Sequence, residues 1–120
     1  MKTTLGHLLK CFLVEGVVCM YVKAARLTFR VEWAKSLKDK RQVRRSLVDK
    51  TRSKFNISVA EVGALDAHQT LIVGVCMVSG ELSHAGQSLD EVIRFMEGQV
   101  EQSGLAELVN VRKGVELWDG

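Results

Sequence analysis

Two kinds of apolar repeat in the sequence predict an α+β fold. Four segments alternate apolar and polar side chains with the period typical of half-buried β-strands. Two longer segments instead repeat their apolar residues at the spacing of an amphipathic helix. The order is β-α-β-β-α-β, which most simply forms a four-stranded antiparallel sheet with both helices on one face, the ferredoxin-like arrangement.

The first strand is predicted over residues 21–31, and the first helix follows it. Ser36 can cap this helix, and Asp39, three residues later, makes a shortened capping box that also suits the helix dipole. The helix is predicted to end near Phe55. Its apolar positions, which gather on one side at about 100° per residue, are Leu37, Val43, Leu47, Val48, Thr51 and Phe55.

The second half of the chain predicts a hairpin, a helix and a last strand. Residues 57–62 and 70–78 are β-rich runs, and the segment between them supplies Gly63 and Asp66 as turn residues. The second helix can stop at Gly104. Its apolar positions are Leu89, Val92, Ile93, Met96 and Val100. The last strand is predicted over residues 108–118, with Val109, Val111, Val115 and Leu117 alternating.

The length of 120 residues and the hydrophobic content of 47% are suited to a single domain with one core. We expect this domain over residues 20–120, preceded by an N-terminal extension over residues 1–19. The extension resembles a secretion signal only briefly, because Lys10 and Glu15 interrupt its apolar stretch. Its leucines suggest a short amphipathic helix, and the alternative is a non-native start upstream of Met20.

Several functional classes find little support in the sequence. The three cysteines are widely spaced and odd in number, which indicates neither a disulfide framework nor a zinc site and favours a cytoplasmic location. We expect Cys76 to be a small core residue. The apolar runs are too short to span a membrane, and no phosphate-binding glycine motif occurs. We therefore expect no metal, no cofactor and no enzymatic activity.

Charge is divided unevenly along the chain. Residues 1–60 contain 14 Lys and Arg against 4 Asp and Glu, a balance of +10, whereas residues 61–120 contain 3 against 10, a balance of −7. A dipolar chain of this kind can meet an anionic partner, or it can meet a second copy of itself through unlike faces.

The run SLKDKR at residues 36–41, FNISVAEVG at 55–63, DAHQ at 66–69 and LIVGVCMVS at 71–79 resemble the YlxP-like family of small bacterial proteins of unknown function. The resemblance covers roughly residues 20–118. It implies a ferredoxin-like fold, no established biochemical activity and no catalytic residues. Because family members are often encoded beside genes for translation initiation and ribosome maturation, it also implies a role near RNA or the ribosome. The first nineteen residues depart from the family pattern.

The first predicted helix carries most of the positive charge. Residues 35–54 contain nine Lys and Arg against two Asp, and four of the nine are arginines, which can pair with phosphate bidentately. Lys38, Arg41, Arg45 and Arg52 share an arc of about 60° away from the apolar side. Lys40 and Arg44 fall among apolar positions, so their stems can cover the core edge while their heads reach the rim. The predicted nucleic-acid-binding residues are Lys38, Arg41, Arg45 and Arg52 on phosphates, with Lys40, Arg44 and Lys54 at the rim.

Three alternatives remain open. A run of charge on a helix is often only its solvated face. The chain can also be a self-associating module, such as a homodimer, in which the basic helix meets an acidic second helix. A small enzyme or metabolite binder would need a pocket around Glu61 or His68. Glu61 lies on the same strand face as apolar residues, and if it is buried, a basic residue of the first helix is its candidate partner.

Overall fold

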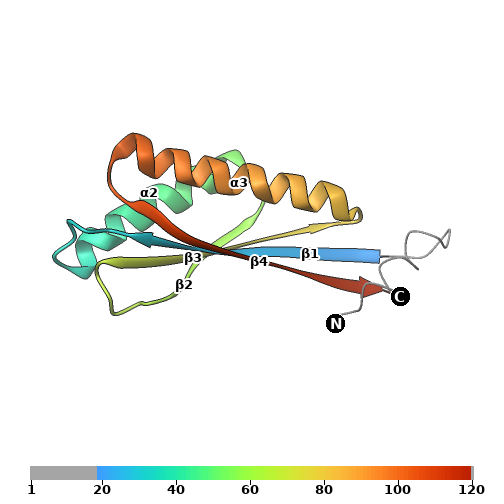
Figure 1. Ribbon diagram of the computed structural model, residues 1–120, viewed down its shortest axis with the longest axis horizontal. Helices are drawn as coiled ribbons and strands as arrows, with labels where there is room; N and C mark the ends of the chain where they lie inside the picture. Colours follow the sequence, from blue (N-terminus) through green and yellow to red (C-terminus); the bar gives the residue numbers. More distant parts are fainter. Residues whose placement is uncertain (1–18, 120) are drawn as a thin grey trace.

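The computed structural model describes residues 19–119, apart from the side chains of residues 82–87. The predicted N-terminal extension lies outside the described residues, except for Cys19. The elements are β1 (Cys19–Arg30), α2 (Leu37–Lys54), β2 (Ser58–Gly63), β3 (Thr70–Ser79), α3 (Leu82–Ser103) and β4 (Glu107–Asp119). The predicted β-α-β-β-α-β order is confirmed, and the arrangement is the α+β, ferredoxin-like one (Figure 1).

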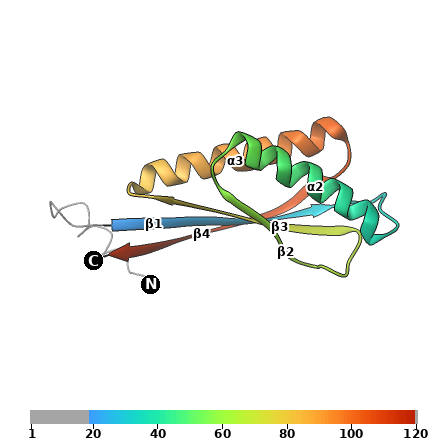
Figure 2. The ribbon, with the colours of Figure 1, turned by 180° about the vertical axis from the view of Figure 1, so that it is seen from behind.

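One sheet and one helical layer make up the fold. The strands follow the spatial order β2-β3-β1-β4, and every neighbouring pair is antiparallel. Both helices cover the same face of the sheet, as the two opposite views show (Figures 1 and 2). The helix α3 contacts the central strands β1 and β3, whereas α2 contacts β2 and β3. The other face of the sheet has no helix over it in the described part of the chain.

The strand alternation decides which side chains enter the core. On β1 and β3, odd-numbered residues face the helices and even-numbered residues face away, because successive side chains point to opposite faces of a strand. The buried side chains of the sheet and helices form one cluster, whose largest members are Leu27, Phe29, Leu71, Leu89 and Met96. The prediction that Cys76 is a core residue is wrong: Cys76 is even-numbered, lies on the uncovered face and is only half-buried.

The predicted alternation of the last strand breaks at one residue. The register pairs Thr28 with Asn110 and Phe29 with Leu108, so Val109 is the extra residue of a β-bulge. Val109 is therefore 44% exposed, and Leu108 packs beside the core in the place predicted for Val109. The sequence pattern missed this shift because a bulge moves the residues on one side of it to the opposite face.

Candidate nucleic-acid interface

The basic helix α2 is fixed at both ends by polar contacts that the sequence anticipates. The Ser36 hydroxyl accepts a hydrogen bond from the Asp39 backbone N–H at 3.2 Å, which confirms the predicted cap. The Asp39 carboxylate accepts from the Lys35 backbone N–H at 2.9 Å instead of from Ser36 itself. At the other end, the Phe55 N–H donates to the Thr51 carbonyl at 2.9 Å. The predicted span of the helix is confirmed.

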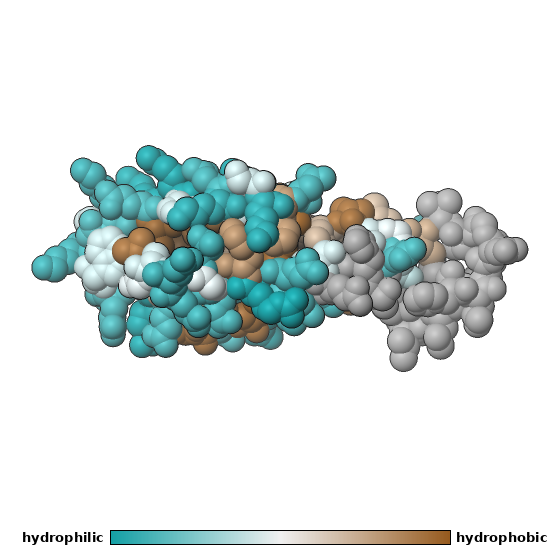
Figure 3. Space-filling view, turned by 90° about the horizontal axis from the view of Figure 1, so that it is seen from above, coloured by the Kyte–Doolittle hydropathy of each residue, from teal (hydrophilic) through white to brown (hydrophobic). Residues whose placement is uncertain are grey.

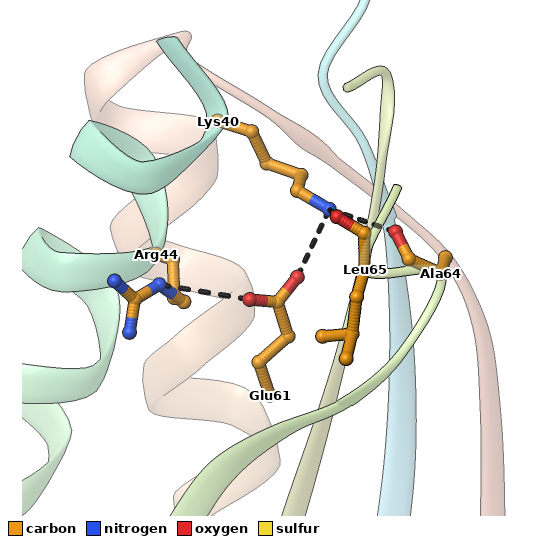
Figure 4. Close-up of polar contacts among 5 residues, drawn as sticks. All are labelled: Lys40, Arg44, Glu61, Ala64 and Leu65. Atoms are coloured by element: carbon orange, nitrogen blue, oxygen red, sulfur yellow. Dashed lines mark hydrogen bonds and ion pairs between the residues drawn. The ribbon is translucent and has the colours of Figure 1, made fainter. Parts of the chain in front are cut away.

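The head of Lys40 is buried and does not reach the rim of the helix. Its side chain is 2% exposed, and its Nζ lies 3.0 Å from Glu61 Oε2. The same ammonium donates hydrogen bonds to the carbonyl oxygens of Ala64, at 2.8 Å, and Leu65, at 3.5 Å (Figure 4). Three oxygens of the protein thus surround this charge, as a buried ammonium requires. Lys40 fastens α2 to the end of β2.

Arg44 joins the same cluster from one turn further along α2. Its Nε lies 3.6 Å from Glu61 Oε1, and its side chain is 34% exposed (Figure 4). Glu61 itself is 14% exposed, so the expectation that a buried Glu61 pairs with a basic residue of the first helix is confirmed. Because the carboxylate is occupied by Lys40 and Arg44, it serves as a structural contact between helix and sheet.

Arg52 and Lys54, at the end of α2, also contact other parts of the protein. The Arg52 guanidinium donates through Nη2 to the Val59 carbonyl at 2.6 Å, which ties the last turn of the helix to β2. The Lys54 ammonium lies 4.9 Å from the ring centre of Phe95 and 5.9 Å from that of Phe55. Such distances permit a cation–π contact. Both side chains are exposed, so each could still approach a ligand from this position.

Lys38, Arg41 and Arg45 form a row of free basic residues on α2, which we call the α2 stripe. All three are exposed, and among residues 19–119 none of them makes an ion pair or a side-chain hydrogen bond. They follow one another at positions i, i+3 and i+7, so they lie along one side of the helix. The view onto the helical layer shows a largely hydrophilic surface (Figure 3). The α2 stripe is therefore a row of three uncompensated positive charges.

An open groove of about 590 Å³ runs between α2 and β2, and Arg45, Asp49 and Glu61 are among its lining residues. The groove combines charges of both signs, and its half-buried carboxylate, Glu61, is already paired with Lys40. His68, the other residue considered for catalysis, lies outside the residues that line it. Across the described residues, no three His, Cys, Asp or Glu side chains gather where they could hold a metal ion.

Comparison with known proteins assigns a family to this geometry. Residues 22–112 match a family model described as "Protein of unknown function (DUF503)". The chain belongs to the DUF503 family. A relative, the uncharacterized protein YlxP of Bacillus subtilis (strain 168), is 33% identical over 64 residues, which cover 53% of this chain and 70% of that protein. The predicted resemblance to YlxP-like proteins is confirmed, and neither comparison attaches an activity to it.

The DUF503 fold also brings together two arginines that sequence reasoning missed. Arg26 in β1 pairs directly with Arg112 in β4, and both lie on the uncovered face of the sheet. The two residues are far apart in the sequence, and only the strand register makes them neighbours. Both arginines occupy polar positions in strands whose residues alternate between apolar and polar. This pattern does not reveal which positions of two strands lie opposite each other.

Within residues 19–119, neither helix is long and apolar enough to cross a membrane.

Proposed function

We propose that this DUF503 protein is a non-enzymatic cytoplasmic domain that contacts RNA, at the ribosome or a maturing ribosomal subunit, through the α2 stripe. The mechanism is electrostatic docking, in which Lys38, Arg41 and Arg45 neutralise phosphates of an RNA backbone. Arg52 and Lys54 flank the α2 stripe as secondary contacts. Lys40 is left out of the contact because its charge is already surrounded by protein oxygens.

The observation that carries the proposal is the lack of compensation along the α2 stripe. On other sides of α2, Lys40 and Arg44 meet Glu61, whereas Lys50 is exposed and makes no polar side-chain contact among residues 19–119. The three charges of the α2 stripe have no ion-pair or hydrogen-bond partner among the described residues. They also follow one another at about one helical turn, so each lies near another positive charge. Uncompensated like charges at helical spacing repel one another, and an anionic ligand removes that cost.

The proposal is tested by co-sedimentation of the purified protein with ribosomal particles over a salt series. The variant Arg41→Gln/Arg45→Gln removes two charges from the α2 stripe. The matched control, Lys50→Gln/Arg94→Gln, removes two exposed charges from α2 and α3 outside the α2 stripe. If three phosphates are neutralised, log K falls with log salt at a slope of about −2 for single-stranded RNA. The stripe variant is expected to bind more weakly and with a shallower slope, and the control to match the wild type.

A second candidate function is self-association. It is favoured by the uncovered sheet face, on which Val62, Val78 and Trp118 are 55%, 63% and 47% exposed. Measuring the mass of the protein in solution across the same salt series separates the two functions. Failure of the wild type to bind particles at low salt, or equal binding by the folded stripe variant, would leave the α2 stripe as a solvated helix face. A dimeric mass would then make self-association the leading function.

A further inference from the structure

Arg26 and Arg112 face each other across two neighbouring strands. In the register of β1 and β4, these two residues are direct partners, on the face that carries no helix. Directly opposed residues of an antiparallel pair have Cβ atoms about 4.5–5.5 Å apart, and like charges at such positions destabilise the sheet. Both arginines are exposed, and among residues 19–119 neither forms an ion pair or hydrogen bond through its side chain. Two like charges therefore lie opposite each other, one on β1 and one on the edge strand β4.

No acidic residue borders the arginine pair. The next pair on one side is Ala24 with Gly114, and the next on the other side is Thr28 with Asn110. The carboxylates of this face are further away: Glu116 is four residues along β4 from Arg112, and Glu107 pairs with Arg30, four residues along β1 from Arg26. Four residues of a strand span about 13 Å, which is longer than the screening length of about 8 Å at physiological salt.

The surroundings leave room for a ligand over the arginines. A Cβ atom added to Gly114 would meet no atom within 4 Å, so the space beside Arg112 is open. Asn110 is exposed and Thr28 is half-buried on the other side, and both can donate uncharged hydrogen bonds. Along β1 and β4, the residues next to the pair are small or polar; on the β3 side, Arg26 pairs with Gly74, and the aliphatic Val62 lies beyond it. A protein–protein contact normally centres on large apolar or aromatic anchors, so this border favours a charged, extended backbone as the ligand.

We infer that Arg26 and Arg112 together bind one phosphodiester group of an RNA backbone on the uncovered face of the sheet. A phosphate between the two guanidinium groups converts their repulsion into two attractive contacts, and arginine is suited to bind phosphate oxygens bidentately. The inference rests on the proposed function for the class of ligand, but it assigns a separate surface. The α2 stripe lies on the helical layer and the arginine pair on the opposite face, so the domain offers RNA two sides.

The test measures the binding of a fluorescently labelled oligouridylate by anisotropy over a salt series. Three double variants, each lowering the net charge by two, are compared with the wild type: Arg26→Gln/Arg112→Gln on the sheet, Arg41→Gln/Arg45→Gln on the α2 stripe, and the control Lys50→Gln/Arg94→Gln. The sheet variant is expected to bind about tenfold more weakly, as the loss of charge-assisted hydrogen bonds implies. Its salt slope should be shallower by about 0.7, the contribution of one phosphate.

A second readout distinguishes a binding role from a structural one. Arg112→Gln alone is expected to raise the melting temperature of the free protein, because it removes the repulsion. The same change should reduce the additional rise in melting temperature that oligouridylate produces in the wild type. Inorganic phosphate is added as a competitor, at the same total concentration of phosphate groups as the oligouridylate. If it does not displace the labelled oligouridylate, a polymeric ligand is supported.

Each contrary outcome identifies which idea has failed. If the sheet variant binds oligouridylate as tightly as the control while the stripe variant binds weakly, the arginine pair is not a phosphate site and the proposed function stands. If only the sheet variant is weakened, the α2 stripe is not the interface. If the sheet variant keeps its RNA affinity but changes the oligomeric mass, the occupant of this face is a second copy of the chain, and the inference is overturned.

Discussion

The ammonium group of Lys40 lies 3.0 Å from the carboxylate of Glu61 and joins the first helix to the edge strand of the sheet. Lys40 comes from α2 and Glu61 from β2, the outermost strand. Among the described residues, Lys40 is the one charged residue that is buried, and Glu61 is 14% exposed. A charge at this depth is stable only while its partners remain.

Substitution Lys40→Met is expected to lower the free energy of unfolding by about 3 kcal/mol, because it leaves the largely buried Glu61 carboxylate with Arg44 as its remaining charged partner. Methionine keeps most of the volume of the buried lysine stem, so the loss reports on the charge. Urea unfolding measures the effect. The double variant Lys40→Met/Glu61→Gln should recover part of the loss, and a single variant as stable as the wild type would contradict a structural role for the pair.

Arg45 and Arg52 should differ in what they contribute to stability. Arg45 makes no polar contact among the described residues, so Arg45→Gln is expected to change the free energy of unfolding by less than about 0.5 kcal/mol. Arg52 donates to the Val59 carbonyl, and Arg52→Gln is expected to cost about 1 kcal/mol. Chemical denaturation of both variants tests the contrast. Equal costs would mean that the Arg52 contact is not stabilising or that Arg45 has a structural partner.

Two glycines, Gly98 within α3 and Gly104 at its end, should change the stability of the protein in opposite directions when each is replaced by alanine. Gly104 ends the helix with φ 69°, in the left-handed region, so Gly104→Ala is expected to destabilise the protein by about 1 kcal/mol. Gly98 lies within the helix, and a Cβ there would meet no atom within 4 Å. Gly98→Ala should therefore stabilise by about 0.5–1 kcal/mol. Thermal melts test this: the melting temperature should be lower than that of the wild type for Gly104→Ala and higher for Gly98→Ala.

The pair formed by Asp90 and Lys113 predicts a local pH dependence. Lys113 donates a hydrogen bond to Asp90 Oδ1 at 2.8 Å, and this contact lowers the pKa of Asp90 below its ordinary value. A depressed pKa contributes stability above the ordinary pKa, and that contribution is lost as the pH falls through the folded-state value. An NMR titration should show the pKa of Asp90 rising toward its ordinary value in Lys113→Met. An unchanged pKa in this exposed position would mean that solvent screens the pair fully.

The fold was predictable from the sequence because its signals are local. The cap at Ser36 and the stop at Gly104 depend on residues within a few positions of each other, and both are confirmed. The strands and helices followed in the same way from repeats inside each segment. The bulge at Val109 escaped because it depends on how β4 is matched to β1, which alternation within β4 does not encode.

The candidate site was predicted only in part, for the same reason. The helical spacing that defines the α2 stripe is local, and it correctly placed Lys38, Arg41 and Arg45 on an exposed side. Whether the head of Lys40 stays in water or turns inward depends on Glu61 and on carbonyl oxygens that the fold brings to it. The pairing of Arg26 with Arg112 likewise arises only when the first and last described strands meet.

The pairing of β1 with β4 affects how the chain folds. The strands β1 and β4 pair over twelve residue positions, yet they stand at the two ends of the described sequence. During synthesis, β1 can join β3 as soon as the hairpin is complete, but its other edge stays open until the last strand has been made. Contacts between such distant segments slow folding. We therefore expect the final, rate-limiting step to be the docking of β4, and a chain shortened before residue 107 to aggregate through the exposed edge of β1.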